Sequence, residues 1–354
     1  MEDTQMEEGN VVLEMETPVA DVFVPPSIHR DETLRGETYT HFSPVPPSLN
    51  ASEPDPSSGV PCVLGVDEAG RGPVLGPMVY GVFYLPTTQS EPLLKTTHHF
   101  DDSKVLTPAV RSGLMETLCT AGTDLHDACG WAVSSLSARD IGANMMRPAG
   151  ATYNLNAQAM DATAELIQGV LARGVNVREI YVDTIGQPAA YQRRLERIFP
   201  TIKITVAKKA DSLYPCVSAA SVCAKVTRDA ALEVLYEAWA QSARERTGGG
   251  GGEGGDDGEE VLSWGSGYPS DARCVAWLKQ NMHPVFGWGP ECRFSWGTAK
   301  DMLETKGGVK IEWPADDEES NNPLTNFFLA NGNGGKDTDE LGTWFGTPAG
   351  LEAF

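Results

Sequence analysis

Short apolar runs alternate with longer segments of helical periodicity between residues 60 and 246. Five runs have the length and the β-branched content of strands, and they are Cys62–Val66, Met78–Tyr84, Trp131–Leu136, Glu179–Asp183 and Ile202–Ala207. The first two runs are joined closely enough to predict an antiparallel pair. Helical segments separate the later runs, which predicts parallel pairing with ligands at the carboxyl ends of the strands.

Apolar positions at helical spacing fill the stretches between and after these runs. The predicted helices are Thr107–Cys119, a helix opened by Ser137, Tyr153–Ala172, Pro188–Phe199, Pro215–Arg246, and two more at 271–281 and 296–305. The alternation of strands and helices predicts an α/β domain, and the last two helices predict a helical cap that follows it.

Three segments lack this periodicity. Residues 1–59 are acidic and Pro-rich, and residues 314–354 are acidic and rich in Gly and Asn, so we expect both tails to be disordered. Residues 247–260 are a glycine run with acidic residues, which predicts a flexible insert. The expected domain therefore consists of a main α/β part at 60–246 and a C-terminal cap at 261–313.

The net charge of −22 changes this picture only through its distribution. Residues 1–60, 247–260 and 301–354 hold 28 of the 49 acidic residues and 5 of the 27 basic ones, which leaves 21 acidic and 22 basic residues for the core. If some of the core acids hold cations, the remaining surface is net positive. A nucleic-acid partner is therefore compatible with the sequence.

The spacing of the cysteines and the lack of long apolar runs predict a protein of a reducing compartment. The seven cysteines are scattered without a Cys-x-x-Cys pair, so we expect reduced core thiols and not a zinc or disulfide framework. No apolar run approaches ~18 residues, and the acidic start is unlike a secretory signal. We expect a soluble intracellular protein that makes no use of a membrane.

Four carboxylates mark the ends of apolar runs. Asp67 and Glu68 follow the first strand directly, Asp183 ends the fourth, and Asp211 follows the fifth. The ordinary interpretation of each is a solvated strand end, but four such groups together suit hard oxygen-ligand metals such as Mg²⁺ or Mn²⁺. A common use of such a cluster is to clamp the oxygens of a phosphoryl transfer between two ions.

Two other polar patterns favour ordinary roles. His98 and His99 are adjacent in a polar loop, where solvated side chains are more common than metal ligands. Ser221 and Lys225 share one helix face, but their spacing differs from the Ser-x-x-Lys pattern of serine-lysine hydrolases.

The acidic positions lie in a set of motifs that resembles type 2 ribonucleases H, and most closely the catalytic (A) subunit of the eukaryotic enzyme. The motifs occur in the family's order and span roughly residues 60–313; they are Asp67-Glu-Ala-Gly-Arg-Gly-Pro73, Asp102-Ser-Lys104, Tyr181-Val-Asp-Thr184, Lys209-Ala-Asp-Ser-Leu-Tyr-Pro215, Ser218-Ala-Ala-Ser-Val-Cys-Ala-Lys225 and Gly265-Ser-Gly-Tyr-Pro269.

The resemblance implies a ribonuclease H-like α/β fold with a central five-stranded mixed sheet, flanking helices and the C-terminal cap. It implies an endonuclease that cleaves the RNA strand of RNA/DNA hybrids and the 5′ side of ribonucleotides embedded in duplex DNA. The products would carry 5′-phosphate and 3′-hydroxyl ends. Two Mg²⁺ or Mn²⁺ ions would be held by Asp67, Glu68, Asp183 and Asp211, and the protein would be nuclear.

The same resemblance implies the substrate contacts. Gly70, Arg71 and Gly72 would approach the 2′-hydroxyl group and the adjacent phosphate. Tyr268 would stack on the following sugar, although the glycine-rich insert just before it departs from the family's pattern. Further substrate contacts are assigned to Lys104, Ser218 and Lys225.

Two alternatives remain open from the sequence. Integrases and exonucleases of the same fold class also use three or four carboxylates, but they need no group that senses a 2′-hydroxyl. A non-catalytic nucleic-acid or scaffold protein is the second alternative, and the complete carboxylate set argues against it.

Partners are expected at the C-terminal end. The resemblance implies two accessory subunits in a heterotrimer, with 309–313 as a candidate contact. Within the tail, Asn321-Asn-Pro-Leu324-Thr-Asn-Phe327-Phe328 resembles the short peptides that dock on sliding clamps, with Leu324, Phe327 and Phe328 as apolar anchors.

Overall fold

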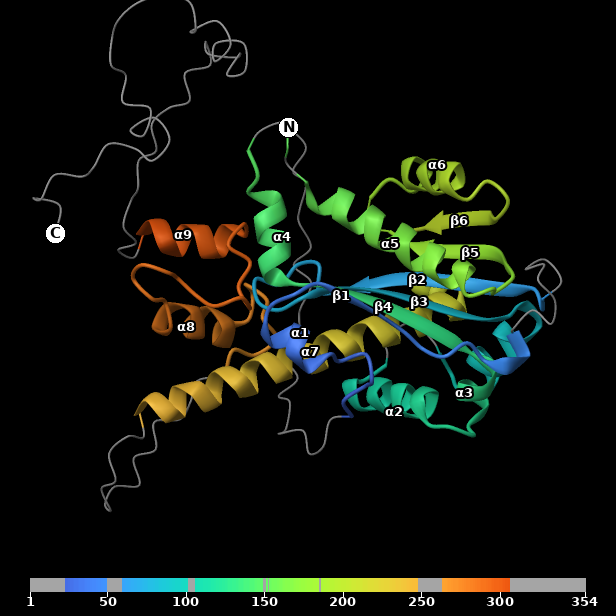
Figure 1. The fold of residues 1–354 in the computed structure, drawn as a ribbon, viewed down its shortest axis with the longest axis horizontal. Helices are drawn as coiled ribbons and strands as arrows, with labels where there is room; N and C mark the ends of the chain where they lie inside the picture. Colours follow the sequence, from blue (N-terminus) through green and yellow to red (C-terminus); the bar gives the residue numbers. More distant parts are fainter. Residues whose placement is uncertain are drawn as a thin grey trace, which may run out of the picture. The chain divides into compact units, whose positions relative to one another are not determined.

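A six-stranded mixed sheet lies at the centre of the computed structural model, in the order β1-β4-β3-β2-β5-β6 (Figure 1). The structure describes residues 23–49, 59–100, 106–148, 151, 153–184, 186–247 and 263–305. The strands are β1 (Tyr39–Phe42), β2 (Cys62–Ala69), β3 (Met78–Pro86), β4 (Gly130–Leu136), β5 (Val177–Asp183) and β6 (Lys203–Ala207).

Strand pairing follows the sequence pattern except at β4. β2 and β3 form the expected antiparallel pair. The prediction of parallel pairing is wrong for β4, which pairs antiparallel with β3 although helices separate the two strands along the chain. β5 pairs parallel with β2, and β6 pairs parallel with β5. The carboxyl ends of β2, β5 and β6 therefore meet at one edge of the sheet, where the candidate acids lie.

Helices cover both faces of the sheet (Figure 1). The larger helices are α2 (Pro108–Cys119), α4 (Ala138–Met145), α5 (Leu155–Ala172), α6 (Pro188–Ile198), α7 (Pro215–Thr247), α8 (Ala272–Gln280) and α9 (Gly297–Thr305). One apolar core joins the sheet to α5 and α6, and a second joins the opposite face to α2 and α7. The cap helices α8 and α9 share a third core with the second half of α7 and with Val74 and Leu75.

Two glycines let α7 lie directly on the sheet. A Cβ atom at Gly65 in β2 would be 2.3 Å from the backbone of Cys216, and one at Gly81 in β3 would be 2.7 Å from the carbonyl oxygen of Ala220. Neither backbone can yield to a side chain at such distances. The first turns of α7 are thereby pressed against the strands that carry and flank Asp67.

The prediction that residues 1–59 are disordered is wrong for residues 23–49. This N-terminal segment forms α1 (Arg30–Leu34), β1 and a short 3₁₀ turn, η1 (Pro47–Leu49). β1 pairs antiparallel with β4, so the sheet has six strands where five were expected. The segment is held by hydrogen bonds to backbone and side-chain groups far along the chain, such as Ser27 to Thr227, which hydrophobic periodicity does not reveal.

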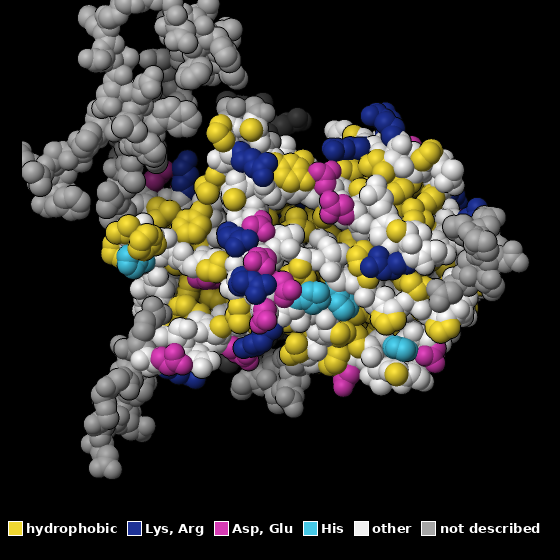
Figure 2. Space-filling model, in the orientation of Figure 1, with side chains coloured by type: hydrophobic (Ala, Val, Ile, Leu, Met, Phe, Trp, Pro, Cys, Tyr) yellow, Lys and Arg dark blue, Asp and Glu magenta, His cyan; other side chains and the backbone are white. Residues whose placement is uncertain are grey.

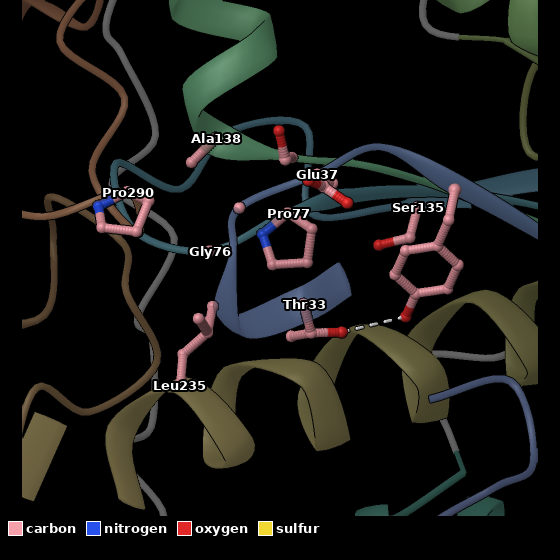
Figure 3. A pocket seen from close by; sticks show the side chains of 11 residues that line it. Thr33, Glu37, Gly76, Pro77, Ser135, Ala138, Leu235 and Pro290 are labelled. Carbon is pink, nitrogen blue, oxygen red and sulfur yellow. Dashed lines mark hydrogen bonds between the residues drawn. The ribbon is translucent and has the colours of Figure 1, made fainter. Parts of the chain in front are cut away.

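The N-terminal segment also closes a small pocket against α7, α4 and the cap (Figure 3). Its lining includes Thr33 and Tyr39, whose hydroxyl groups hydrogen-bond, together with Leu235 and Pro290. None of the four candidate acids lines this pocket. The pocket is a seam between packed segments and not the candidate active site.

Charged side chains of both signs are interspersed on the face seen in Figure 2. Ion pairs such as Arg35–Glu37 and Arg139–Asp140 join charges of opposite sign in the described part of the chain. This face is therefore not the uniformly basic surface that a phosphate backbone favours.

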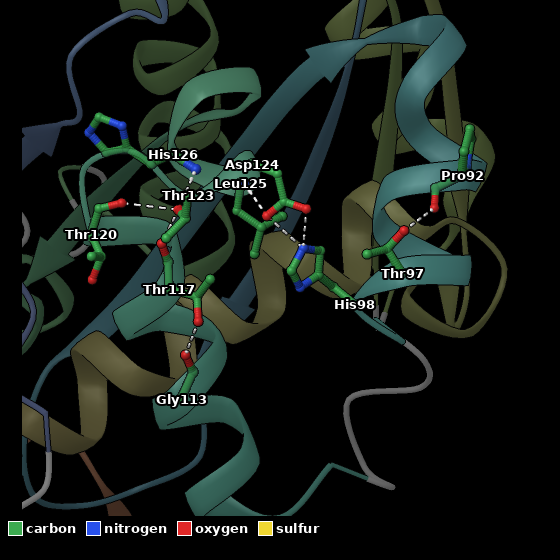
Figure 4. Close-up of polar contacts among 10 residues, drawn as sticks. All are labelled: Pro92, Thr97, His98, Gly113, Thr117, Thr120, Thr123, Asp124, Leu125 and His126. Atoms are coloured by element: carbon green, nitrogen blue, oxygen red, sulfur yellow. Dashed lines mark hydrogen bonds and ion pairs between the residues drawn. The ribbon is translucent and has the colours of Figure 1, made fainter.

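His99 is exposed as expected, whereas His98 is only partly exposed and has a side-chain partner. η4 (Ser90–Thr97), a π-helix, ends at His98, whose Nε2 lies 2.9 Å from both carboxylate oxygens of Asp124 at the start of α3 (Asp124–Ala128) (Figure 4). The His98 side chain is only 18% exposed. This contact fastens η4 to α3 and gives His98 a structural role.

Other expectations have mixed outcomes. All seven cysteines are free, and all but Cys119 are buried, as expected. No helix in the described part of the chain is long and apolar enough to span a bilayer. Residues 1–22, most of the glycine-rich insert and residues 306–354 lie outside the described residues, so the predictions about them stay predictions.

Candidate active site

The ends of three strands bring the candidate acids to one edge of the sheet. Val66 pairs with Val182, so Asp67 and Asp183 follow at equivalent positions on neighbouring parallel strands. Asp211 lies in η5 (Ala210–Ser212), a 3₁₀ turn between β6 and α7. Ala210 N–H donates to Asp183 Oδ1 at 2.8 Å, which ties this turn to the end of β5.

Asp67 and Glu68 lie on opposite faces of β2, because the strand continues to Ala69. Asp67 shares the face that packs on α7, where the fully buried Ser221 lies, and is itself only 6% exposed. Glu68 shares the face that packs on α5 and α6 and lies close to Arg71. The two carboxylates therefore lie on opposite faces of the sheet at the same edge.

Asp67, Glu68 and Asp183 lie near enough for their charges to affect one another's pKa. Burial, together with the negative charges of Glu68 and Asp183, raises the pKa of Asp67 well above its usual range, and Ser221 acts in the opposite direction. Burial also raises the pKa of Glu68 to about 7; Arg71 opposes this rise and Asp183 adds to it. Such acids are costly to ionise together unless a cation joins them.

Backbone N–H groups hold the carboxylates in place. Glu68 N–H donates to Asp67 Oδ1 at 2.7 Å, and Ser212 N–H donates to Asp211 Oδ1 at 3.1 Å. Among the described residues, no group of three or more His, Cys, Asp or Glu side chains is placed so that it could hold a metal ion as it stands. The donor set is all oxygen and anionic, which fits Mg²⁺ or Mn²⁺ and does not fit zinc.

The Gly70–Gly72 turn leaves β2 immediately after these acids. Gly70 has a φ of +76°, and a Cβ atom there would lie 2.6 Å from the carbonyl oxygen of Pro77. The guanidinium group of Arg71 donates to Asn156 of α5 and, at 3.5 Å, to the hydroxyl group of Tyr80. Arg71 is thus directed across the face that carries Glu68.

The C-terminal cap holds this turn through groups that the sequence analysis missed. Arg293 is fully buried and donates to the carbonyl oxygens of Gly70 at 2.6 Å and Arg71 at 3.1 Å. The indole N–H of Trp296 donates to Gly72 O at 2.9 Å. Arg293 is 222 positions from Arg71 and carries no periodic signal, so hydrophobic spacing could not have suggested it.

Tyr268 lies beside the turn, as the resemblance implies. A Cβ atom at Gly72 would be 3.2 Å from Tyr268 Cε1, and the tyrosine is 39% exposed. Gly267 O accepts hydrogen bonds from Val74 N–H and Leu75 N–H, which anchors the Gly265–Pro269 loop to the segment after the turn. The insert before this loop has not displaced it.

The other predicted contacts have different outcomes. Ser218 on α7 is fully buried, which does not fit a contact with substrate, and Ser221 is the serine that neighbours Asp67. Lys225 is half-buried on the same helix. Lys104, Leu324, Phe327 and Phe328 lie outside the described residues.

Asp271 caps α8 and fixes the Tyr268 loop. It accepts hydrogen bonds from Ser266 N–H and Oγ, both at 2.9 Å, and from Arg273. Burial by itself raises the pKa of Asp271, but the hydrogen bonds from Arg273 and Ser266 outweigh it and lower the pKa to about 2.

The Asp271→Asn variant is therefore expected to lose about 1–2 kcal/mol of unfolding free energy at neutral pH. A carboxyl group with a lowered folded-state pKa stabilises the fold above its unfolded pKa of about 4 and loses this effect as pH falls toward about 2. Denaturant unfolding should show a constant difference between the two proteins above about pH 5 that shrinks below about pH 4. A difference that grows in acid would contradict this role.

Comparisons with known proteins agree with these motifs. The family model described as ribonuclease HII matches residues 64–251. Proteins named as the A subunit of ribonuclease H2 are similar: that of Neurospora crassa is 62% identical over 95% of this chain and 98% of its own, and that of Homo sapiens is 42% identical over 77% and 83%. The solved ribonuclease H2 of Pyrococcus horikoshii aligns with a TM-score of 0.49 at 27% identity, covering 69% of this chain and 97% of its own.

Proposed function

We propose that this chain, which belongs to the ribonuclease HII family and is an endonuclease, depends on divalent metal ions and recognises the 2′-hydroxyl group of a ribonucleotide. It would cleave the RNA strand of RNA/DNA hybrids and the 5′ side of ribonucleotides embedded in duplex DNA. The observation that supports this most is the meeting of Asp67, Glu68 and Asp183 beside a turn that packs against Tyr268.

Asp67, Glu68, Asp183 and Asp211 would hold the metal ions. Bound Mg²⁺ or Mn²⁺, two ions per site, would supply an activated water and charge stabilisation for the departing 3′ oxygen. The products would then carry 5′-phosphate and 3′-hydroxyl ends. The buried position of Asp67 limits its exposure to bulk water, which strengthens its attraction for a cation.

The Gly70–Gly72 turn would select RNA. Its glycines allow the backbone to approach a sugar closely, and Arg71 can bind the adjacent phosphate. The carbonyl oxygens of Gly70 and Arg71 already accept hydrogen bonds from Arg293, so a 2′-hydroxyl group would be a second donor to them or an acceptor from the amides. Tyr268 would stack on the next sugar with its exposed ring.

Cleavage of a duplex with one embedded ribonucleotide tests this function. With Mg²⁺, the full chain together with the subunits that copurify with it is expected to cut once, on the 5′ side of the ribonucleotide, and to leave an all-DNA duplex intact. Chelation of the metal should abolish the cut. Cleavage of the all-DNA duplex at a similar rate would instead favour an exonuclease-like or integrase-like enzyme of this fold class.

The partners follow from the relatives and from the tail. The relatives are each named as one subunit of ribonuclease H2, which implies a multi-subunit assembly. The proposal includes two accessory subunits in a heterotrimer, a nuclear location, and roles in primer removal and ribonucleotide repair.

A peptide covering residues 321–328 is expected to bind a sliding clamp and to lose binding when Phe327 and Phe328 become Ala. Equal binding of both peptides, or of neither, would remove the clamp as a partner.

A further inference from the structure

Two buried arginines lie behind the substrate-facing loops. Arg293 lies in the cap segment between α8 and α9 and is fully buried. Its guanidinium group donates to three backbone carbonyl oxygens: Gly70 at 2.6 Å, Gly76 at 3.0 Å and Arg71 at 3.1 Å. Its ring neighbour is Trp296, whose centroid is 4.8 Å from the guanidinium carbon. Arg293 therefore fixes both ends of the segment that contains the Gly70–Gly72 turn.

Arg228 on α7 reaches the second loop. It is 6% exposed, donates through Nη2 to Ser266 O at 2.5 Å, and lies 5.7 Å from the centre of the Tyr268 ring. It also fills the space beside two glycines: a Cβ atom at Gly70 would be 3.1 Å from its Cγ, and one at Gly267 would be 3.3 Å from its Nη2. Arg228 thus contacts the turn and the loop at once.

This arrangement is costly if packing is its only role. The two arginines are close enough for their charges to oppose each other. Arg228 Nη1 donates to Asp229 Oδ1 at 3.0 Å, but the Asp229 side chain is half exposed, and Arg228 Nε makes no hydrogen bond within the described residues. Buried guanidinium groups without full compensation are rare, and apolar residues of similar size would fill the same volume. What an apolar residue cannot do is hold several carbonyl oxygens of separate loops at fixed positions, which the planar fork of Arg does.

We propose that Arg228 and Arg293 are positioning residues that set the spacing between the Gly70–Gly72 turn and the Gly265–Pro269 loop, and that they thereby select the junction between one ribonucleotide and the deoxyribonucleotide that follows it. The proposal rests on the proposed function, because it assumes that the turn reads the 2′-hydroxyl group and that Tyr268 reads the next sugar. Neither arginine needs to touch the substrate.

The two substrates place different demands on this spacing. A continuous RNA/DNA hybrid offers a 2′-hydroxyl group at every nucleotide, so a displaced turn still meets one. A single embedded ribonucleotide offers one 2′-hydroxyl group followed by one deoxyribose. The turn must then meet this hydroxyl group while the Tyr268 loop meets the next sugar. Loosening the arginine pair should therefore affect the single-ribonucleotide duplex more than the hybrid.

The test compares Arg293→Lys and Arg228→Lys with the unchanged chain, each purified with its copurifying subunits, on both duplexes. Lys keeps the charge but cannot bond several carbonyl oxygens from one plane. We expect kcat/KM on the single-ribonucleotide duplex to fall about tenfold or more beyond its fall on the hybrid. The Mg²⁺ concentration for half-maximal rate should not change. Equal losses on the two duplexes, or no loss on either, would overturn the proposal.

Controls separate this role from general stability. The Arg139 guanidinium group also donates to a backbone carbonyl oxygen, that of Arg35. Arg139→Lys should therefore leave the ratio of kcat/KM on the two duplexes unchanged. A shift of that ratio in Arg139→Lys as large as in Arg293→Lys would overturn the proposal. Arg228→Lys removes fewer carbonyl contacts than Arg293→Lys and keeps the test available if the latter unfolds.

A double-mutant cycle gives a second readout. On the single-ribonucleotide duplex, Arg228→Lys should lower kcat/KM much less in a Tyr268→Phe protein than in the unchanged chain, because both substitutions impair recognition of the same junction. Fully additive losses would count against the proposal. Failure of the unchanged enzyme to cut this duplex would contradict the proposed function itself, and is thereby distinguished from failure of this inference.

Discussion

The Asp67→Asn variant is expected to lose hydrolysis by about a thousandfold or more, while the metal-free protein becomes harder to unfold. The loss follows because Asp67, whose charge is opposed by those of Glu68 and Asp183, is one of the acids that would hold the metal ions. The gain, about 1–2 kcal/mol, follows because Asn is neutral and removes the repulsion with Glu68 and Asp183. Initial rates and denaturant unfolding of the two proteins without metal measure the two effects.

The pH dependence fixes the sign of this stability effect. A carboxyl group whose pKa is raised in the folded state destabilises the fold increasingly as pH rises above its unfolded pKa of about 4. The advantage of Asn should therefore be small near pH 4 and grow toward neutral pH. Asp127→Asn, at a side chain that is 64% exposed, is the control and should change neither quantity. A metal-free Asp67→Asn protein that is less stable at neutral pH would show that the acids do not repel each other.

The Gly70→Ala variant is expected to lose about 2–4 kcal/mol of unfolding free energy and most of its cleavage activity. Its φ of +76° is unfavourable for Ala, and the new Cβ atom would lie 2.6 Å from the backbone oxygen of Pro77, which cannot rotate away. The turn must shift, and with it Arg71 and the carbonyl oxygens that Arg293 holds.

Gly122→Ala is the matched control, because Gly122 has a φ of +85° with no atom within 4 Å of an added Cβ atom. It should cost only the conformational strain, about 1 kcal/mol, and leave cleavage intact. Thermal unfolding and initial rates of both variants separate the effect of an unfavourable φ from the effect of the clash between the new Cβ atom and the Pro77 carbonyl oxygen. Equal effects of the two substitutions on cleavage would mean that the turn has no special part in the reaction.

The sequence predicted the elements that hydrophobic spacing controls. The strands that carry Asp67 and Asp183 and the long helix after Asp211 have their expected ends within a few residues, because apolar runs and proline or glycine boundaries are local signals. The meeting of the acids was also predictable, since the carboxyl ends of parallel strands share one edge of a sheet. The Gly72–Tyr268 contact was accessible only through the family resemblance.

The remainder depends on long-range polar contacts. β1 has no clear alternation, and its segment is held by bonds such as Ser137 N–H to Thr38 Oγ1. Arg228 and Arg293 appear in the sequence as ordinary basic residues, and only their burial and carbonyl partners reveal a role. Ser218 illustrates the opposite error, because a motif position can be conspicuous and still be fully buried.

Anomalous diffraction from Mn²⁺ in crystals of the enzyme with an uncleaved single-ribonucleotide duplex tests the central claim most directly. Peaks are expected at the edge of the sheet, within coordinating distance of carboxylate oxygens of Asp67, Glu68, Asp183 and Asp211, and beside the ribose that contacts the Gly70–Gly72 turn. Saturating Mn²⁺ bound elsewhere, or a peak from which Asp67 is absent, would contradict the account.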